Sequence, residues 1–192
     1  SGGAERIVLD WAAAASRRQP VSIAVLRDVQ ATWPVPAGVE VRCFHGQNVV
    51  QGLRDFAAFA KAELANVHPP RDVPVPPPVI LCHLLADAER AVLREAGVLT
   101  VPVLHNAAAG WREPVLSLRD DHAVLAVSQS VARDYRDAGG RLPCVVVRHV
   151  PRLAAPRADA REHWRARWAL PAKAWVIGMV GGVKPQKAYP RA

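Results

Sequence analysis

Residues 79–106, VILCHLLADAERAVLREAGVLTVPVLHN, contain the pattern that decides the fold. The apolar runs at 79–84 and 100–105 are continuous, which is typical of strands that are buried on both faces of a parallel sheet. Residues 85–96 between them are predicted to form a helix. A strand, a helix and a second strand in this order predict a parallel βαβ unit.

The same alternation continues along most of the chain. Further strands are predicted at 21–26, 39–44, 123–128, 144–149 and 175–181, and further helices at 4–17, 48–66, 129–138 and 157–168. Repeated alternation of this kind predicts an α/β fold with a doubly wound, mostly parallel Rossmann-like sheet.

A domain boundary is expected within RHVPRLAAPRAD (148–159), where two prolines meet a charged composition. We therefore expect a first domain at 1–152, and a linker with the beginning of a second domain at 153–192. Two glycines precede the first predicted helix, as in a loop that leaves a strand, so a first strand is expected to be missing. The second domain is expected to be truncated, because one strand with one helix cannot bury its own faces.

The composition limits the classes of function. The chain has 192 residues, of which 51% are apolar and 22% are charged, so it is expected to be globular. Its net charge of +8 favours anionic partners such as nucleic acid, phosphorylated ligands or an acidic membrane surface. The basic residues are scattered, which disfavours nucleic acid. No apolar run approaches the ~20 residues of a membrane span, so the expected location is cytoplasmic or peripheral at the inner face of the membrane.

The cysteines, Cys43, Cys82 and Cys144, are widely spaced and form no zinc-ligand pattern. Cys43 and Cys82 stand inside apolar runs, which predicts buried thiols. We expect all three to be reduced, as in a cytosolic protein, and we expect no metal site.

Polar residues follow the predicted strands. His83 ends the strand at 79–84, and His105 and Asn106 end the strand at 100–105. Because ligands of open parallel sheets bind outside the carboxyl ends of the strands, these side chains are expected at one ligand-binding edge. An imidazole there can transfer a proton or bind a hydroxyl near neutral pH. The alternative for His83 is a structural residue at a strand end.

Two further residues are candidates for the same edge. Ser128 ends the strand at 123–128, although it is more simply the N-cap of the next helix. Trp111 lies in a loop near His105, where it could form the wall of a pocket.

Glycines at both ends of the chain suit a phosphate group. Gly2 and Gly3 precede a helix, whose N-terminus and backbone N–H groups attract anions, although a tight turn is the alternative. Gly181 follows a predicted strand, and Lys184 and Lys187 come soon after it. A flexible cation beside a glycine turn can bind phosphate, but the segment is not a Walker loop.

Four stretches together resemble family-4 glycosyltransferases, which have the GT-B fold. They are GGAERIVLDWA (2–12), ILCHLLADAERAVLREAGVLTVPVLHNAAAGW (80–111), AVLAVSQSVARDYRDAGG (123–140) and RARWALPAKAWVIGMVGGVKPQKAY (165–189), in the order of that family. The resemblance implies two Rossmann-like domains that face each other across a cleft. The N-terminal domain would bind the acceptor, and the C-terminal domain would bind the nucleotide-sugar donor.

The resemblance also implies roles for single residues. His105 would touch the transferred sugar as the catalytic residue, and the Gly2–Gly3 loop would lie between donor phosphates and acceptor. Gly181 and Lys187 would bind the donor diphosphate. The sequence departs from the family at Gly182, where the family usually has arginine, and Lys184 could supply the missing cation.

These features lead to two functional hypotheses. The first is a glycosyltransferase that transfers sugar with retention, without metal or cofactor, from a nucleotide-sugar donor to a polysaccharide, glycolipid or small-molecule acceptor. The 192-residue piece is expected to be inactive by itself and could contact an anionic membrane. The second hypothesis is a non-catalytic Rossmann-like module that binds a nucleotide or a partner.

Overall fold

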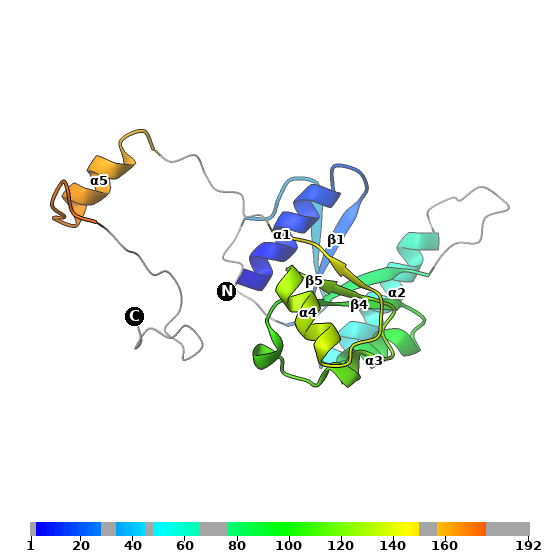
Figure 1. The fold of residues 1–192 in the computed structure, drawn as a ribbon. Coiled ribbons are helices and arrows are strands. Elements are labelled where there is room, and N and C mark those ends of the chain that lie inside the picture. Colours follow the sequence, from blue (N-terminus) through cyan, green and yellow to red (C-terminus); the bar gives the residue numbers. More distant parts are fainter. Residues whose placement is uncertain (1–2, 28–33, 45–47, 66–76, 150–156, 176–192) are drawn as a thin grey trace. The chain divides into compact units, whose positions relative to one another are not determined.

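A computed structural model describes residues 3–27, 34–44, 48–65, 77–149 and 157–175 (Figure 1). The chain divides into two compact units, Ser1–Arg152 and Leu153–Ala192. The predicted strand at 175–181 lies outside the described residues beyond Trp175, and so do Gly2, Gly181, Lys184 and Lys187.

The first unit alternates strands and helices as predicted. Its elements are α1 (Gly3–Ala15), β1 (Val21–Val25), β2 (Val39–Cys43), α2 (Val49–Ala65), β3 (Val79–His83), α3 (Asp87–Glu95), β4 (Leu99–Leu104), β5 (Val124–Ala126), α4 (Gln129–Asp137) and β6 (Cys144–Val146). The second unit contains α5 (Ala160–Arg167). Six predicted strands and five predicted helices are therefore confirmed, although β5 and β6 are shorter than expected. The 3₁₀ turns at Ala108–Gly110 and Val115–Leu118 were not predicted.

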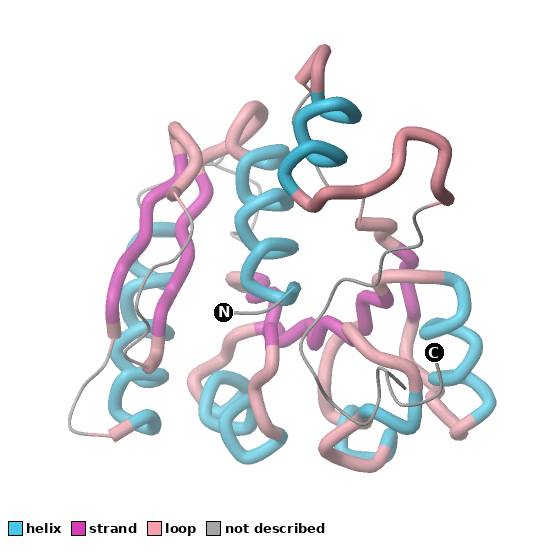
Figure 2. The backbone as a smooth tube through the Cα atoms, turned by 90° about the vertical axis from the view of Figure 1, so that its left-hand side faces the viewer, coloured by secondary structure: helices cyan, strands magenta, loops and turns pink. Residues whose placement is uncertain are grey.

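The strands form two parallel sheets. One sheet contains β1 and β2, and the other has the order β3-β4-β5-β6. Figure 2 shows them as separate groups of strands. Rossmann-type sheets commonly have the order 3-2-1-4-5-6. In this chain β1 and β2 are neighbours, and β3, β4, β5 and β6 lie side by side in chain order. The expected strand ahead of Gly2 stays a prediction.

The exposure of β3 corrects one part of the prediction. We expected strands buried on both faces, and β4 fulfils this with four consecutive buried residues. In β3, however, Val79 and Leu81 are 57% and 44% exposed. Val79 and Leu81 are two residues apart and so lie on the same face of the sheet, while Cys82 on the other face is buried, so β3 is covered on one face only.

The core of the first unit lies on both sides of β4. One cluster joins α2, β3 and α3 through Leu53, Ala57, Cys82 and Leu93. A second part of the core joins β5 to α4 and includes Val124, Ala126, Val131, Ala132 and Tyr135. Burying these side chains holds the helices on the sheet and fixes where the loops after β3, β4 and β5 emerge.

The cysteines are only partly as expected. All three are free thiols, and Cys82 is buried, which raises its pKa to about 12. Cys43 is exposed instead of buried, because it ends β2 at the outer edge of the two-stranded sheet.

Candidate functional site

Two histidines meet where β3 and β4 end. His83 is the last residue of β3 and pairs in register with Val103, and His105 follows β4 directly. Nδ1 of His83 lies 3.0 Å from Nε2 of His105, a hydrogen-bond distance. The parallel register therefore brings together two of the residues that the sequence predicted for this edge. We call His83 and His105 the histidine pair.

Both rings of the histidine pair are held in the neutral form. Burial, followed by the nearby His105, lowers the pKa of His83 to about 4. Burial also lowers the pKa of His105, although the charge of Glu5 opposes this and that of His149 adds to it. Each neutral imidazole has one N–H donor and one acceptor nitrogen. In the hydrogen bond between the two rings, one ring therefore donates and the other accepts.

The second nitrogen of His105 has no partner. Among the described residues, Nδ1 of His105 is the buried side-chain nitrogen or oxygen without a hydrogen bond. A buried polar atom left unpaired costs about 1–3 kcal/mol, so native proteins keep few of them. Such an atom next to a ligand-binding edge is the feature expected where a ligand supplies the missing partner.

Helix α1 contacts the same edge. The ring of Trp11 lies edge-on to that of His83, with the centroids 5.8 Å apart. The preceding residue, Asp10, accepts a hydrogen bond of 3.0 Å from Nε2 of His149, which follows β6. This hydrogen bond, together with Arg6, lowers the pKa of Asp10 despite its partial burial. Helix α1 is thus fixed to the chain segments that follow β3 and β6.

A cavity of about 270 Å³ opens beside His105. Its wall includes Asn106, Gly110 and Trp111 from the loop after β4. Nε1 of Trp111 donates a hydrogen bond of 2.7 Å to the carbonyl oxygen of Asn106, which closes this loop. Gly110 suits the closed loop, because a Cβ there would lie 3.0 Å from Cβ of Asn106.

The cavity also touches a strained residue. Leu84 lines the cavity directly after His83 and has a φ of 60°, in the left-handed region that bulky side chains rarely adopt. Strained residues of this kind cluster at ligand sites. Arg27 follows β1, lines the cavity as well, and forms an ion pair with Glu89 of α3.

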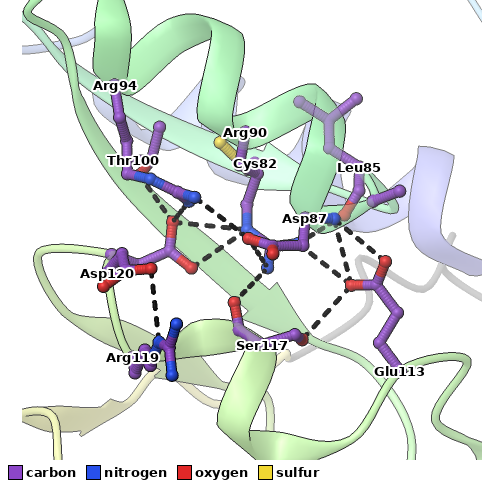
Figure 3. Close-up of polar contacts among 12 residues, drawn as sticks. Cys82, Leu85, Asp87, Arg90, Arg94, Thr100, Glu113, Ser117, Arg119 and Asp120 are labelled. Carbon is purple, nitrogen blue, oxygen red and sulfur yellow. Dashed lines mark hydrogen bonds and ion pairs between the residues drawn. The ribbon is translucent and has the colours of Figure 1, made fainter.

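Arg90 and Glu113 also line the cavity. Figure 3 shows the polar contacts around Arg90. Arg90 of α3 is 2% exposed and donates to Asp121, with 3.0 Å between Nε and Oδ2. Asp121 also accepts hydrogen bonds from Arg94, at 3.0 Å, and from Thr100 of β4, at 2.5 Å. The guanidinium of Arg90 further donates to the carbonyl oxygens of Leu85 and Ser117. We call Arg90, Arg94, Thr100 and Asp121 the arginine–aspartate network.

Glu113 joins the network to the start of α3. Its two carboxylate oxygens accept from the backbone N–H of Asp87, at 2.9 and 3.1 Å. A carboxylate is stabilised at this end of a helix, where N–H groups have no partner within the helix. The N-terminus of α3 is therefore already occupied by the protein's own carboxylate and is not open to a ligand anion.

The sequence-predicted residues fall into three groups. His83, His105, Asn106 and Trp111 gather around the histidine pair and the cavity. Ser128 instead caps α4 by accepting a hydrogen bond of 3.3 Å from the N–H of Val131, as its structural interpretation predicted. Gly3 begins α1, whereas Gly2, Gly181, Lys184 and Lys187 lie outside the described residues.

Several residues of the site were missed from the sequence. Arg27 and His149 both follow strands, so the rule that identified His83 and His105 could also have found them. Asp10, Leu84 and Glu113 had no such signal, because their roles depend on contacts with distant segments or on local backbone conformation.

The described residues hold neither a metal-ligand cluster nor a helix that could span a membrane. No group of three or more histidine, cysteine or acidic side chains there is arranged to bind a metal ion. In the same part of the chain, no helix is both long and apolar enough to cross a bilayer.

Parallel strands joined by helices, with polar side chains at their carboxyl edge, define an α/β domain with a Rossmann-like sheet, consistent with a GT-B domain. The sequence matches no known protein family and no curated protein. Among solved structures, the fold is similar to that of Anabaena Alr3699/HepE, crystallised in complex with UDP and glucose. The identity is 18% and the TM-score 0.57, and the match covers 98% of this chain and 52% of that one. This chain therefore spans about half of that protein's length.

Proposed function

We propose that this chain is the acceptor-binding part of a glycosyltransferase that takes a sugar from a nucleotide-sugar donor. The acceptor is a polysaccharide, a glycolipid or a small molecule, and the transfer retains the anomeric configuration without a metal ion. The observation that carries this proposal is the buried Nδ1 of His105, which lies beside a cavity at the carboxyl edge of the sheet and has no hydrogen-bond partner in the part of the chain that the structure describes. The fold neighbour crystallised with UDP and glucose supports the same class of ligand.

In this proposal His105 contacts the transferred sugar. A neutral imidazole can donate to or accept from a sugar hydroxyl, and the lowered pKa of His105 keeps its ring neutral at pH 7. A neutral ring also avoids repelling the positive charge that develops on the sugar as the glycosidic bond breaks. His105 therefore orients the sugar and does not serve as a charged acid.

The leaving group requires a different set of residues. Negative charge grows on the nucleotide diphosphate as the bond breaks, and fixed N–H groups and cations stabilise such charge. We assign this role to the Gly2–Gly3 loop, to Gly181 and to Lys187, with Lys184 in place of the arginine absent at Gly182. The second Rossmann-like domain would complete the donor site.

The cavity beside His105 suits the acceptor. Its wall combines the ring of Trp111 with polar groups of Asn106, Arg27 and Glu113. Small-molecule sites commonly pair one apolar wall with a few polar groups that fix orientation. Because Asn106 follows His105 directly, an acceptor bound against Asn106 would lie next to the sugar that it receives.

The test measures sugar transfer by the full-length protein with a panel of nucleotide sugars. His105→Ala should lower kcat/KM about 100-fold or more, the usual cost of removing a group that contacts the reacting centre. His122→Ala is the matched control, because His122 is exposed on the loop before β5. NMR of the product's anomeric proton tests retention.

Two outcomes would contradict the proposal. Turnover that survives His105→Ala would remove the residue on which the assignment depends. Donor binding without turnover, equally tight in the variant, would favour the non-catalytic nucleotide-binding module.

A further inference from the structure

We propose that His83 is a positioning residue: it binds Nε2 of His105 and leaves Nδ1 of His105 as the atom that pairs with a ligand hydroxyl. This inference rests on the proposed function, because it names the group that prepares His105 for the sugar. It starts from two observations on one ring. One nitrogen of His105 faces His83 at 3.0 Å, and the other is buried with no partner among the residues that the structure describes.

His83 is held firmly enough for this role. It ends β3, whose backbone pairs with β4 from Val79 to His83. Trp11 of α1 lies against its ring edge-on, and the ring of His105 lies 5.1 Å away between centroids. A side chain fixed by the sheet and by packing can determine the orientation of its neighbour.

The proton between the two rings can be assigned. If His83 donated, Nδ1 of His105 would carry a hydrogen with no acceptor, and buried N–H groups without a partner are rare. If His105 donates from Nε2, its Nδ1 carries only a lone pair, which a hydroxyl can satisfy on binding. The arrangement therefore favours the Nε2–H form of His105, with Nδ1 as the acceptor for a hydroxyl group.

The surrounding charges do not supply the missing partner. Glu5 from α1 and His149 from the segment after β6 act on His105 through their charge, and His83 faces it from β3. Nδ1 of His105 nevertheless has no hydrogen bond among the described residues. A neutral hydroxyl, from water or from a sugar, is the donor that fits a neutral ring in this position.

The first experiment measures the tautomer in the 192-residue chain by ¹⁵N NMR of the histidine rings. The wild type should show His105 in the Nε2–H form. His83→Phe keeps an aromatic ring but cannot accept the hydrogen bond, so both tautomers of His105 should appear. His83→Gln provides an amide oxygen and should restore the Nε2–H form, and amide spectra report whether each variant is folded.

The second experiment measures transfer by the full-length protein. His83→Phe should lower kcat about tenfold to a hundredfold with little change in KM for the donor, because a reacting group is misplaced. His83→Gln should recover most of the loss, whereas a role in packing alone would favour Phe over Gln. Adding the donor sugar should shift the ¹⁵N signal of His105 Nδ1 in the wild type. If the signal already shows a hydrogen-bonded Nδ1 before the donor is added, water is the partner and the ligand assignment is overturned.

The outcomes separate this inference from the proposed function. An unchanged tautomer and unchanged kcat in His83→Phe overturn the positioning role, even if His105→Ala abolishes transfer. If His83→Phe loses the single Nε2–H form of His105 while His105→Ala leaves sugar transfer unchanged, His83 does position His105 but the enzymatic function is overturned. Recovery by Phe but not by Gln assigns His83 to packing.

Discussion

Two buried polar clusters lie at opposite ends of β4, and they differ in how completely their atoms are paired. At the amino end, Asp121 accepts hydrogen bonds from Arg90, Arg94 and Thr100 within the arginine–aspartate network. At the carboxyl end, the two rings of the histidine pair contact each other, and Nδ1 of His105 has no hydrogen bond to any described residue. The cavity touches both, through Arg90 at one end and His105 at the other.

The difference distinguishes a group that stabilises the fold from one available to a ligand. A buried network with every member bonded is rigid, because each change leaves a charge without a partner. An unpaired atom lowers stability and gains its bond only when a ligand binds. We therefore expect changes in the arginine–aspartate network to affect unfolding, and changes in the histidine pair to affect binding and acid sensitivity.

The largest expected effect comes from breaking the network. Asp121→Ala should lower the free energy of unfolding by about 3–5 kcal/mol, because Arg90 would be left buried without its carboxylate. Urea unfolding followed by circular dichroism measures this loss. The control is Asp120→Ala at the neighbouring residue, whose pair with Arg119 is exposed, and it should change stability by less than about 1 kcal/mol. Equal losses of stability in Asp121→Ala and Asp120→Ala would contradict the expectation that the buried ion pair contributes more than the exposed one.

The second prediction concerns acid. The pKa of His83 is about 4 in the folded chain, below the ordinary value of about 6.5 for the unfolded one. The unfolded state therefore binds the extra proton first, and stability should fall as the pH drops from about 6.5 to about 4. The loss should be about 3 kcal/mol, and His83→Gln should remove most of it.

Unfolding curves at a series of pH values test this through the difference between wild type and His83→Gln. The difference in unfolding free energy between wild type and His83→Gln should be nearly constant above pH 7 and should change between pH 6.5 and 4. A difference that is the same at every pH would show that His83 can take up its proton within the fold.

The smallest effect is expected where α1 contacts the edge of the sheet. The hydrogen bond from His149 lowers the pKa of Asp10, so the folded state holds its carboxylate in the charged form. This contribution is complete above the ordinary pKa of about 4 and is lost as the pH falls through the lower folded value. Asp10→Asn should therefore cost less than about 1 kcal/mol at pH 7 and nothing at the lowest pH.

The same unfolding series provides the measurement, with Asp137→Asn at an exposed position of α4 as control. The pH window separates the two acid effects, since Asp10 acts below the range in which His83 acts. A loss for Asp10→Asn that persists at low pH would point to packing and not to the charge.

Much of the fold follows from local patterns. Continuous apolar runs identified β3 and β4, and the helix between them was placed within two residues of its observed start. Once the strands are parallel, their carboxyl ends share one edge, which is why His83, His105 and Asn106 could be grouped in advance. The same rule applied to Arg27 and His149 would have extended the site.

Other features had no local signal. Arg90 and Asp121 are 31 residues apart, and in the sequence they resemble a helix surface charge and a loop acid. Asp10 and His149 are separated by 139 residues. Ser128 had two interpretations, and only the hydrogen bond to Val131 assigns it to the helix cap. The division of the strands into two sheets was also not predicted, because the order of strands in the chain does not specify which edges pair.

The sequence by itself determined that apolar strands alternate with helices, and therefore which residues stand at the carboxyl edge of a parallel sheet. The tertiary structure alone decided that Nε2 of His105 meets His83 while its Nδ1 has no partner within the described ranges, and that Asp121 is enclosed by two arginines. The physical reason is that the pattern of apolar residues along the sequence indicates, for each residue, whether its side chain is buried. Hydrogen bonds between buried polar groups depend instead on ångström distances between segments that only folding brings together.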